Sequence, residues 1–143
     1  MYEFQCLAFG LSSAPWIFTK ILKPIVSFLR KNGLRLIIYL DDILILNSSA
    51  EGAERDYLFT VSILENCGFL INVDKSVGAP SQTMEYLGLV IDSKSFSLSL
   101  RLKKVAEIIT ICSTALKRDS VSLREIAKIL GNLAWAIKAS HFA

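Results

Sequence analysis

The chain has 143 residues, a length that allows one domain with a hydrophobic core, and a net charge of +3, which permits contact with nucleic acid without requiring it. Hydrophobic residues make up 52% of the chain and the mean hydropathy is +0.46, so we expect a missing partner to cover part of the apolar surface. The sequence has no apolar run of about 18 residues, so no transmembrane helix is expected. It also has no signal-peptide pattern and no zinc-type cysteine spacing, and we expect an intracellular protein, cytoplasmic or nuclear and not secreted.

The first predicted elements are an extended segment and a long helix. Residues 1–7 are rich in aromatic side chains and predict an extended segment, which Gly10 interrupts. Apolar residues then recur with a three-four spacing up to about Lys31, and this predicts a helix with one buried face. Ser12 or Ser13 would cap the helix, and Pro24 inside it predicts a kink.

Basic residues dot this predicted helix. They are Lys20, Lys23, Arg30 and Lys31. Two interpretations are open: these side chains form an ordinary solvated face, or they contact the phosphate groups of a template or substrate.

Two adjacent carboxylates, Asp41 and Asp42, lie between two short apolar runs. Residues 34–40 and 43–46 are rich in Ile and Leu and are too short for comfortable helices, so they predict two strands joined by a tight turn. Each carboxylate raises the cost of ionising the other, and a hard divalent cation such as magnesium would relieve that repulsion. Because Asp is common in solvated turns, the ordinary alternative is a turn without a metal.

The middle of the chain alternates predicted helix and strand. A helix is expected over residues 50–66, ended by Gly68, and a strand is expected over residues 69–73. Residues 84–91 and 96–100 alternate in polarity and predict a hairpin of two strands around a polar turn.

Two helices are predicted at the C-terminal end. The first begins near residue 101 and ends at basic residues 117 and 118, and Ser122 with Glu125 forms a capping box that opens the second. Gly131 inside the second helix predicts close packing against another element. Together the predicted elements indicate an α+β fold, an antiparallel sheet with helices packed on one face.

Four motifs stand in an order and at a spacing that resemble one family. Tyr39-Leu40-Asp41-Asp42, between two apolar strands, resembles the Tyr-x-Asp-Asp box of reverse transcriptases, which are RNA-directed DNA polymerases. Residues 7–15 with Phe18 and Lys20 resemble the family's motif B, residues 68–72 with Lys75 and Ser76 its motif D, and Glu85-Tyr86-Leu87-Gly88 its motif E. The amino-acid sequences of these motifs are most similar to those of reverse transcriptases from retrotransposons, DIRS-like elements in particular.

The resemblance implies a set of site residues. Asp41 and Asp42 would be catalytic metal ligands, Asp41 being the better candidate because it is the first Asp of the box. Lys75 would act as a proton donor near the leaving pyrophosphate, although an exposed turn lysine is the ordinary alternative. The residues implied to line the nucleotide and template site are Phe9, Gly10, Ser13, Ala14, Pro15 and Tyr39, and those implied to grip the primer are Tyr86, Leu87 and Gly88.

The reaction implied by the resemblance is an in-line attack of a primer hydroxyl on the α-phosphate of a deoxynucleotide triphosphate. Two Mg²⁺ or Mn²⁺ ions, about 3.5–4 Å apart, would stabilise the attacking and leaving oxygens. The implied partners are an RNA or DNA template with its primer and the deoxynucleotide triphosphates, and no membrane.

One catalytic residue of the family is missing from the sequence. The family requires an earlier Asp, in motif A, but Glu3 is the only acidic residue before motif B and it does not stand in a motif A context. The finger segments are missing too. We therefore expect a reverse transcriptase fragment that is inactive alone, with residues 1–100 forming a partial palm (motifs B to E) and residues 101–143 the helical start of a thumb.

Other interpretations remain open. The chain could be a non-catalytic nucleic-acid-binding relic of a reverse transcriptase, or an unrelated α+β interaction domain in which the two Asp residues only form a turn. RNA-dependent RNA polymerases with a Gly-Asp-Asp turn fit less well, because Tyr39 and Leu40 precede the pair.

Overall fold

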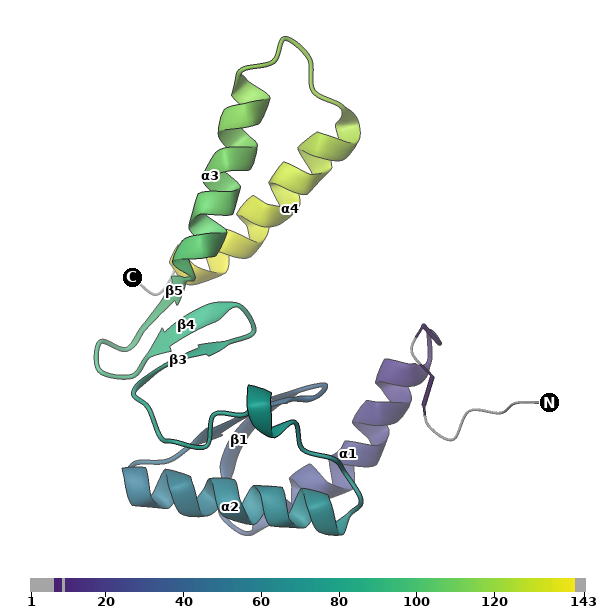
Figure 1. The fold of residues 1–143 in the computed structure, drawn as a ribbon, viewed down its shortest axis with the longest axis vertical. Coiled ribbons are helices and arrows are strands. Elements are labelled where there is room, and N and C mark those ends of the chain that lie inside the picture. Colours follow the sequence, from purple (N-terminus) through teal and green to yellow (C-terminus); the bar gives the residue numbers. More distant parts are fainter. Residues whose placement is uncertain (1–6, 9, 141–143) are drawn as a thin grey trace, which may run out of the picture. The chain divides into compact units, whose positions relative to one another are not determined.

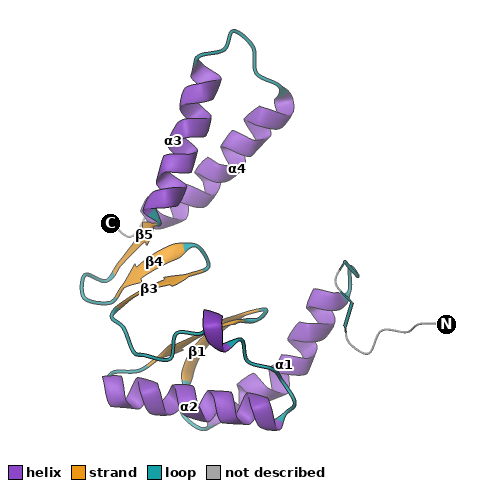
Figure 2. Cartoon of the chain, in the orientation of Figure 1, coloured by secondary structure: helices purple, strands orange, loops and turns teal. Residues whose placement is uncertain are grey.

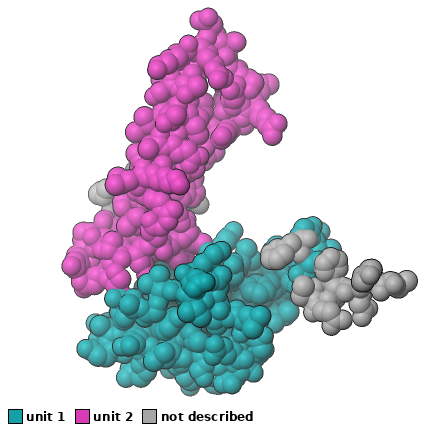
Figure 3. All heavy atoms as spheres, in the orientation of Figure 1, with its two compact units in different colours: residues 1–80 teal, residues 81–143 magenta. Residues whose placement is uncertain are grey.

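Four α-helices and two antiparallel sheets make up the part of the chain that the computed structural model describes, residues 7–8 and 10–140 (Figures 1 and 2). The chain divides into two units, residues 1–80 and residues 81–143 (Figure 3). The α+β fold class predicted from the sequence is confirmed, with the strands divided between two sheets. The extended segment expected over residues 1–7 falls almost entirely outside the described residues.

The first unit contains two long helices and a β-hairpin. Its elements are α1 (Ala14–Lys31), β1 (Arg35–Tyr39), β2 (Asp42–Leu46), α2 (Ala50–Asn66) and the short 3₁₀ helix η1 (Val73–Lys75). β1 and β2 pair in antiparallel register from Arg35 opposite Leu46 to Tyr39 opposite Asp42. The hairpin predicted around the two carboxylates is therefore present.

Helix α1 forms where the apolar spacing predicted it. Pro15 stands in its first turn, where a missing backbone N–H is tolerated, and Pro24 lies inside it as expected. Ser13 occupies the N-cap position, but its side chain makes no capping hydrogen bond there. The helix ends at Asn32, and Gly33 then adopts a φ of +89°, a left-handed conformation that glycine accepts without a steric cost.

The core of the first unit lies between the hairpin and the two helices. Val26, Leu29 and Leu34 are buried together with Leu36 of β1, and Leu29 is 1% exposed. Residues that face each other in an antiparallel pair share one side of the sheet, so Leu36 and Ile45 turn the same side of the hairpin toward this core. The hairpin is thereby fixed against α1 and α2.

The strand predicted over residues 69–73 is wrong. Helix α2 ends with Gly68 at a φ of +85°, and the N–H of Phe69 donates back to the carbonyl of Leu64 at 3.0 Å. The Phe69 ring packs edge-on against Phe18 of α1, with ring centroids 6.1 Å apart. Leu70 is fully exposed, and residues 69–72 pair with no strand in the described part of the chain, so apolar composition alone did not produce a strand here.

The second unit contains a three-stranded sheet and two helices. Its elements are β3 (Thr83–Tyr86), β4 (Leu89–Asp92), β5 (Ser97–Leu100), α3 (Leu102–Leu116) and α4 (Leu123–Ser140). The strand order is β3-β4-β5, and both pairs are antiparallel. The prediction of one strand over residues 84–91 is wrong, because a tight turn at Leu87 and Gly88 divides that stretch into β3 and β4.

A capping box and an ion pair lie at the N-terminal ends of the two helices of this unit. The capping box predicted at the start of α4 is present: the Ser122 N–H and hydroxyl donate to the Glu125 carboxylate at 3.0 and 2.8 Å, and the Glu125 N–H donates to Ser122 Oγ. These bonds hold the pKa of Glu125 below its usual value of 4.5, and the Arg118 guanidinium adds to the effect. Arg101, at the N-cap of α3, forms an ion pair with Glu85 of β3.

The expectation for Gly131 is wrong. A Cβ placed at this position would meet no described atom within 4 Å, so the glycine is not required by close packing within the described structure.

Among the described residues, no helix has the length and apolar content needed to cross a membrane.

Candidate active site

The two carboxylates lie at the tip of the β1–β2 hairpin. Tyr39 pairs with Asp42, so Leu40 and Asp41 alone form the turn, and Asp42 is the first residue of β2. Leu40 adopts a φ of +52°, a conformation that residues with a side chain rarely take. Both Asp side chains belong to exposed residues. The turn and the first residue of β2 therefore place two adjacent, exposed carboxylates at the tip of the hairpin.

The hairpin tip lies beside α1. Leu40 and Ile38 line a hollow of about 320 Å³ together with Thr19, Lys20 and Lys23 of that helix, and other residues of α1 complete it. The turn that carries Asp41 is thus next to two lysine side chains. Two cationic side chains beside the turn are an electrostatic setting that favours an anionic substrate.

The predicted motif B residues begin the same helix. Gly10 adopts a φ of +87°, Ser13 is the N-cap, and Ala14 and Pro15 form the first turn, where the Thr19 hydroxyl donates to the Pro15 carbonyl at 2.8 Å. Because Thr19 also lines the hollow with Leu40, the start of α1 and the hairpin tip belong to one region of the first unit. Phe9, the remaining predicted motif B residue, lies outside the described residues.

The donor set at the tip suits a hard divalent cation. Carboxylate oxygens are the ligands that Mg²⁺ prefers, and Mg²⁺ is commonly held by one or two carboxylates together with substrate phosphates and water. Within residues 7–8 and 10–140, no group of three or more His, Cys, Asp or Glu side chains is placed to hold a metal. Asp41 and Asp42 can therefore supply part of a metal site, and the remaining ligands would have to come from a substrate or from other residues.

Lys75 lies in an exposed turn, as the sequence predicted. It closes the single turn of η1, and its N–H donates to the side-chain oxygen of Asn72 at 3.2 Å. The residue is exposed and it belongs to the same unit as the hairpin. Its predicted role as a proton donor stays a prediction.

The predicted primer-gripping residues form the β3–β4 turn of the second unit. Leu87 and Gly88 both have positive φ, +50° and +80°, the pattern of a type I′ turn whose twist matches the flanking strands. The Trp135 ring of α4 lies against the turn, with Cζ2 3.1 Å from where a Cβ on Gly88 would lie. No sequence pattern predicted this contact of Trp135, since a single aromatic residue in a helix carries no signal of what it contacts.

The chain is similar in sequence to known proteins. Residues 1–91 match the family described as "Reverse transcriptase (RNA-dependent DNA polymerase)". The chain is 27% identical over 136 residues to the Gag-Pol polyprotein of avian leukosis virus subgroup A (isolate RSA) and 26% identical over 136 residues to that of Rous sarcoma virus subgroup B (strain Schmidt-Ruppin). These alignments cover 94% of this chain and 8% of each polyprotein.

The fold is similar to that of a solved structure described as the foamy viral protease-reverse transcriptase dRH in complex with double-stranded DNA. The TM-score is 0.63 and the sequence identity is 24%, and the similarity covers 86% of this chain and 19% of the foamy viral chain. At this identity the likeness supports the fold. The chain spans less than a fifth of the length of these relatives.

Proposed function

The chain belongs to the reverse transcriptase family, and from this premise we propose that it supplies the carboxylate hairpin and the neighbouring motifs B, D and E of an RNA-directed DNA polymerase. In the proposed assignment, residues 1–100 are a partial palm and residues 101–143 the start of a thumb. The partners are a primer on an RNA or DNA template and deoxynucleotide triphosphates. The similarity of the fold to a reverse transcriptase bound to double-stranded DNA supports a nucleic-acid partner.

One observation carries this proposal. Asp41 stands in a two-residue turn with a strained neighbour, Leu40, and the turn lies beside the helix that motif B begins. Non-glycine residues held at positive φ cluster at functional sites, where the surrounding structure over-determines their conformation. A solvated turn without a function would be expected to carry Gly or Asn at that position.

The residues of the chain would divide the chemistry as follows. Asp41 and Asp42 would hold Mg²⁺ or Mn²⁺, which when bound supplies charge stabilisation for the phosphoryl oxygens. Tyr39 would lie under the primer end, and the turn at Leu87 and Gly88 would hold it. Lys75 would donate a proton to the leaving group.

The finer assignment is a retrotransposon origin, DIRS-like in particular. It is supported by the amino-acid sequences of the four motifs, whereas the relatives described above are retroviral polyproteins. We also propose that the chain alone does not polymerise, because the described residues offer only two carboxylates at the tip and no third metal ligand of the same kind. The second candidate function is a non-catalytic nucleic-acid-binding relic, which the similarity of the fold to a reverse transcriptase in complex with double-stranded DNA supports.

Metal binding tests the carboxylate pair directly. We expect Mn²⁺ to broaden the NMR signals of the hairpin residues in the whole chain, and Asp41→Asn to weaken Mn²⁺ binding by more than the roughly 10-fold effect typical of a residue next to the ligands. Asp119→Asn, an exposed carboxylate of the second unit, is the matched control and should leave the broadening unchanged. Equal Mn²⁺ affinity in the wild type and Asp41→Asn would show that the pair is only a turn.

A primer-extension assay tests the activity. With Mg²⁺ or Mn²⁺ and a primed template, we expect no template-dependent synthesis by the chain alone, and synthesis would disprove the proposed inactivity. Binding of primer–template that weakens steeply with salt, without synthesis, would favour the nucleic-acid-binding relic.

A further inference from the structure

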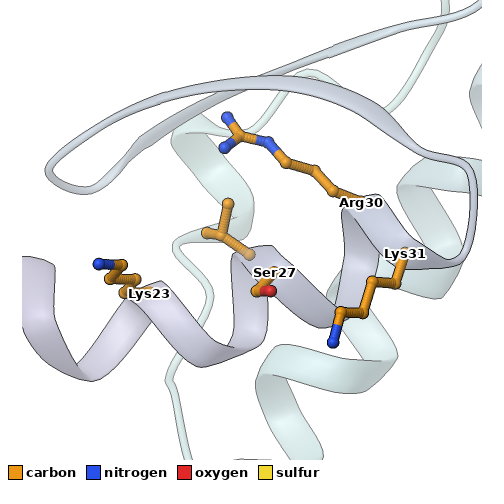
Figure 4. A pocket seen from close by; sticks show the side chains of 5 residues that line it. Lys23, Ser27, Arg30 and Lys31 are labelled. Atoms are coloured by element: carbon orange, nitrogen blue, oxygen red, sulfur yellow. The ribbon is translucent and has the colours of Figure 1, made fainter.

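The β1–β2 hairpin is held at its base by side chains of both long helices of the first unit. The base is the end of the hairpin where Arg35 pairs with Leu46, opposite the tip that carries the two carboxylates. Arg30, which lines a hollow of about 420 Å³ on α1, points toward the hairpin, and its Nη2 donates to the Leu36 carbonyl at 3.1 Å (Figure 4). This bond ties β1 to α1, and a second set of contacts ties the end of β2 to α2.

Asn47, the residue that follows β2, makes this second connection with both ends of its side-chain amide. Its Nδ2 donates to Asp56 Oδ2 of α2 at 2.7 Å, and its Oδ1 accepts from the Ser49 N–H at 3.2 Å. A hydrogen bond to a carboxylate is stronger than one between neutral groups. Because Ser49 already caps α2 by accepting from the Gly52 N–H, the start of the helix does not depend on Asn47.

The Asn47 side chain occupies the space where Gly52 would carry a Cβ. A Cβ built on Gly52 would lie 2.7 Å from Asn47 Cγ, closer than carbon atoms approach without a bond. Gly52 is a buried residue of α2 and its φ is not positive, so its backbone does not require glycine. Glycine is also a poor helix former. The contact with Asn47 therefore explains the glycine, and we call Asn47, Asp56 and Gly52 the Asn47 clamp.

Helix α2 provides the clamp with a fixed attachment point. Phe59 and Ile63 of this helix pack against the buried core of the first unit. Thr60 is 3% exposed, and its hydroxyl donates to the Asp56 carbonyl at 2.7 Å. The turn of α2 that carries Asp56 is thus anchored in the core, so the hydrogen bond to Asn47 transmits that fixed position to the end of β2.

We propose that Asn47 is a positioning residue for the carboxylates at the hairpin tip. The proposal rests on the proposed function of Asp41 and Asp42 as metal ligands. A strand rises about 17 Å from Asp42 to Asn47, so a tilt of about 10° at the base would move the tip by roughly 3 Å relative to α1. Functional groups must be held to within about 0.5 Å of their productive geometry, so the site depends on how firmly the base is held.

NMR of the whole chain with bound Mn²⁺ measures where the tip lies. The ion broadens each signal according to the inverse sixth power of its distance, and Lys20 of α1 lines the same hollow as Leu40 of the tip, so its signal should broaden in the wild type. In Asn47→Ala we expect the Mn²⁺ affinity to stay near that of the wild type, because both carboxylates remain. The broadening of Lys20 relative to that of Asp42 should change several-fold, because the tip is displaced.

Exchanging the two polar partners tests the hydrogen bond itself. Asn47→Asp alone places two carboxylates together, and it should displace the tip as Asn47→Ala does. When Asn47→Asp is combined with Asp56→Asn, the amide at position 56 donates to the carboxylate at position 47, so the wild-type broadening should return. A folded double variant that keeps the displaced pattern would overturn the proposal.

Gly52→Ala separates positioning of the tip from stability of the helix. Alanine favours a helix more than glycine does, but its Cβ would displace the Asn47 amide. We expect α2 to stay helical by circular dichroism and the tip to shift as in Asn47→Ala. Gly131→Ala is the matched control, because a Cβ there meets no described atom within 4 Å, and it should leave the broadening unchanged. An unchanged pattern in Gly52→Ala would show that Asn47 only shapes the loop between β2 and α2.

The clamp and the metal site can fail separately. If Mn²⁺ does not bind the wild type, the proposed metal site is wrong, and the chemical shifts of the Leu40 methyl groups and the Lys20 amide still report the position of the tip. Shifts in Asn47→Ala that the exchanged pair reverses would support the clamp without a metal. Mn²⁺ binding with identical broadening and identical Leu40 signals in every clamp variant would retain the metal site and overturn the clamp.

Discussion

At the scale of single residues, Leu40 is one of three described non-glycine residues with a left-handed backbone conformation, together with Leu87 and Phe96. It is a leucine at a φ of +52° in a two-residue turn, between Tyr39 and Asp41. We expect Leu40→Val to destabilise the chain by about 1 kcal/mol, because a β-branched side chain fits the left-handed region worse, and Leu40→Asn to be neutral or stabilising, because Asn tolerates it. Urea unfolding of the three proteins measures this. Equal stability of the Val and Asn variants would mean that the turn is not strained.

At this scale, features that depend on local residue type could be predicted from the sequence, whereas contacts between residues far apart in the chain could not. Two adjacent Asp residues between apolar runs predicted the hairpin tip correctly, because strand length and turn preference are local. The contact of Trp135 with Gly88 joins residues 47 positions apart, and no local pattern encodes it. The roles assigned to Lys75 and to the motif B residues stay predictions, since they require a bound substrate.

At the scale of elements, two glycines of the second unit have opposite requirements. Gly88 has a φ of +80° and lies against the Trp135 ring, so Gly88→Ala should destabilise this unit by about 1 kcal/mol or more and change the emission of Trp135. Gly131 is inside α4 with open space where a Cβ would lie, so Gly131→Ala should stabilise it by about 0.8–1 kcal/mol. Chemical denaturation followed by fluorescence measures both. Stabilisation by Gly88→Ala would contradict the described turn.

The elements themselves were predicted unevenly, for a physical reason. Helix α2 was predicted at its observed bounds, because Ser49 accepts a hydrogen bond from the Gly52 N–H at one end and Gly68 ends it at the other. The stretch over residues 69–73 looked equally apolar, yet it lacks a described partner strand, and a strand exists only through its ladder of hydrogen bonds. The turn at Leu87 was hidden because leucine is not a turn residue, and only the following glycine indicated it.

At the scale of the whole molecule, the sequence predicted the class of fold but not the division into units. Motif order suggested one boundary near residue 100, based on function, whereas the compact units divide after residue 80. The two descriptions concern different properties, so the functional boundary stays a prediction. Composition indicated that apolar side chains would be exposed, and Leu130 of α4 and Phe28 of α1 are among those that are. That a partner covers them stays a prediction.

The division into two units leads to a prediction about stability. Leu29 is almost completely buried in the first unit, and Leu29→Ala should cost that unit about 2–5 kcal/mol, because it removes buried methyl groups and leaves a cavity. Ile108 is a buried residue of α3, and Ile108→Ala is the matched variant for the second unit. Because the two residues lie in different compact units, we expect hydrogen exchange measured by mass spectrometry to accelerate in α1, α2 and the hairpin for Leu29→Ala, and in α3 and α4 for Ile108→Ala. Faster exchange throughout the chain in both variants would show instead that residues 1–80 and 81–143 unfold as one cooperative body.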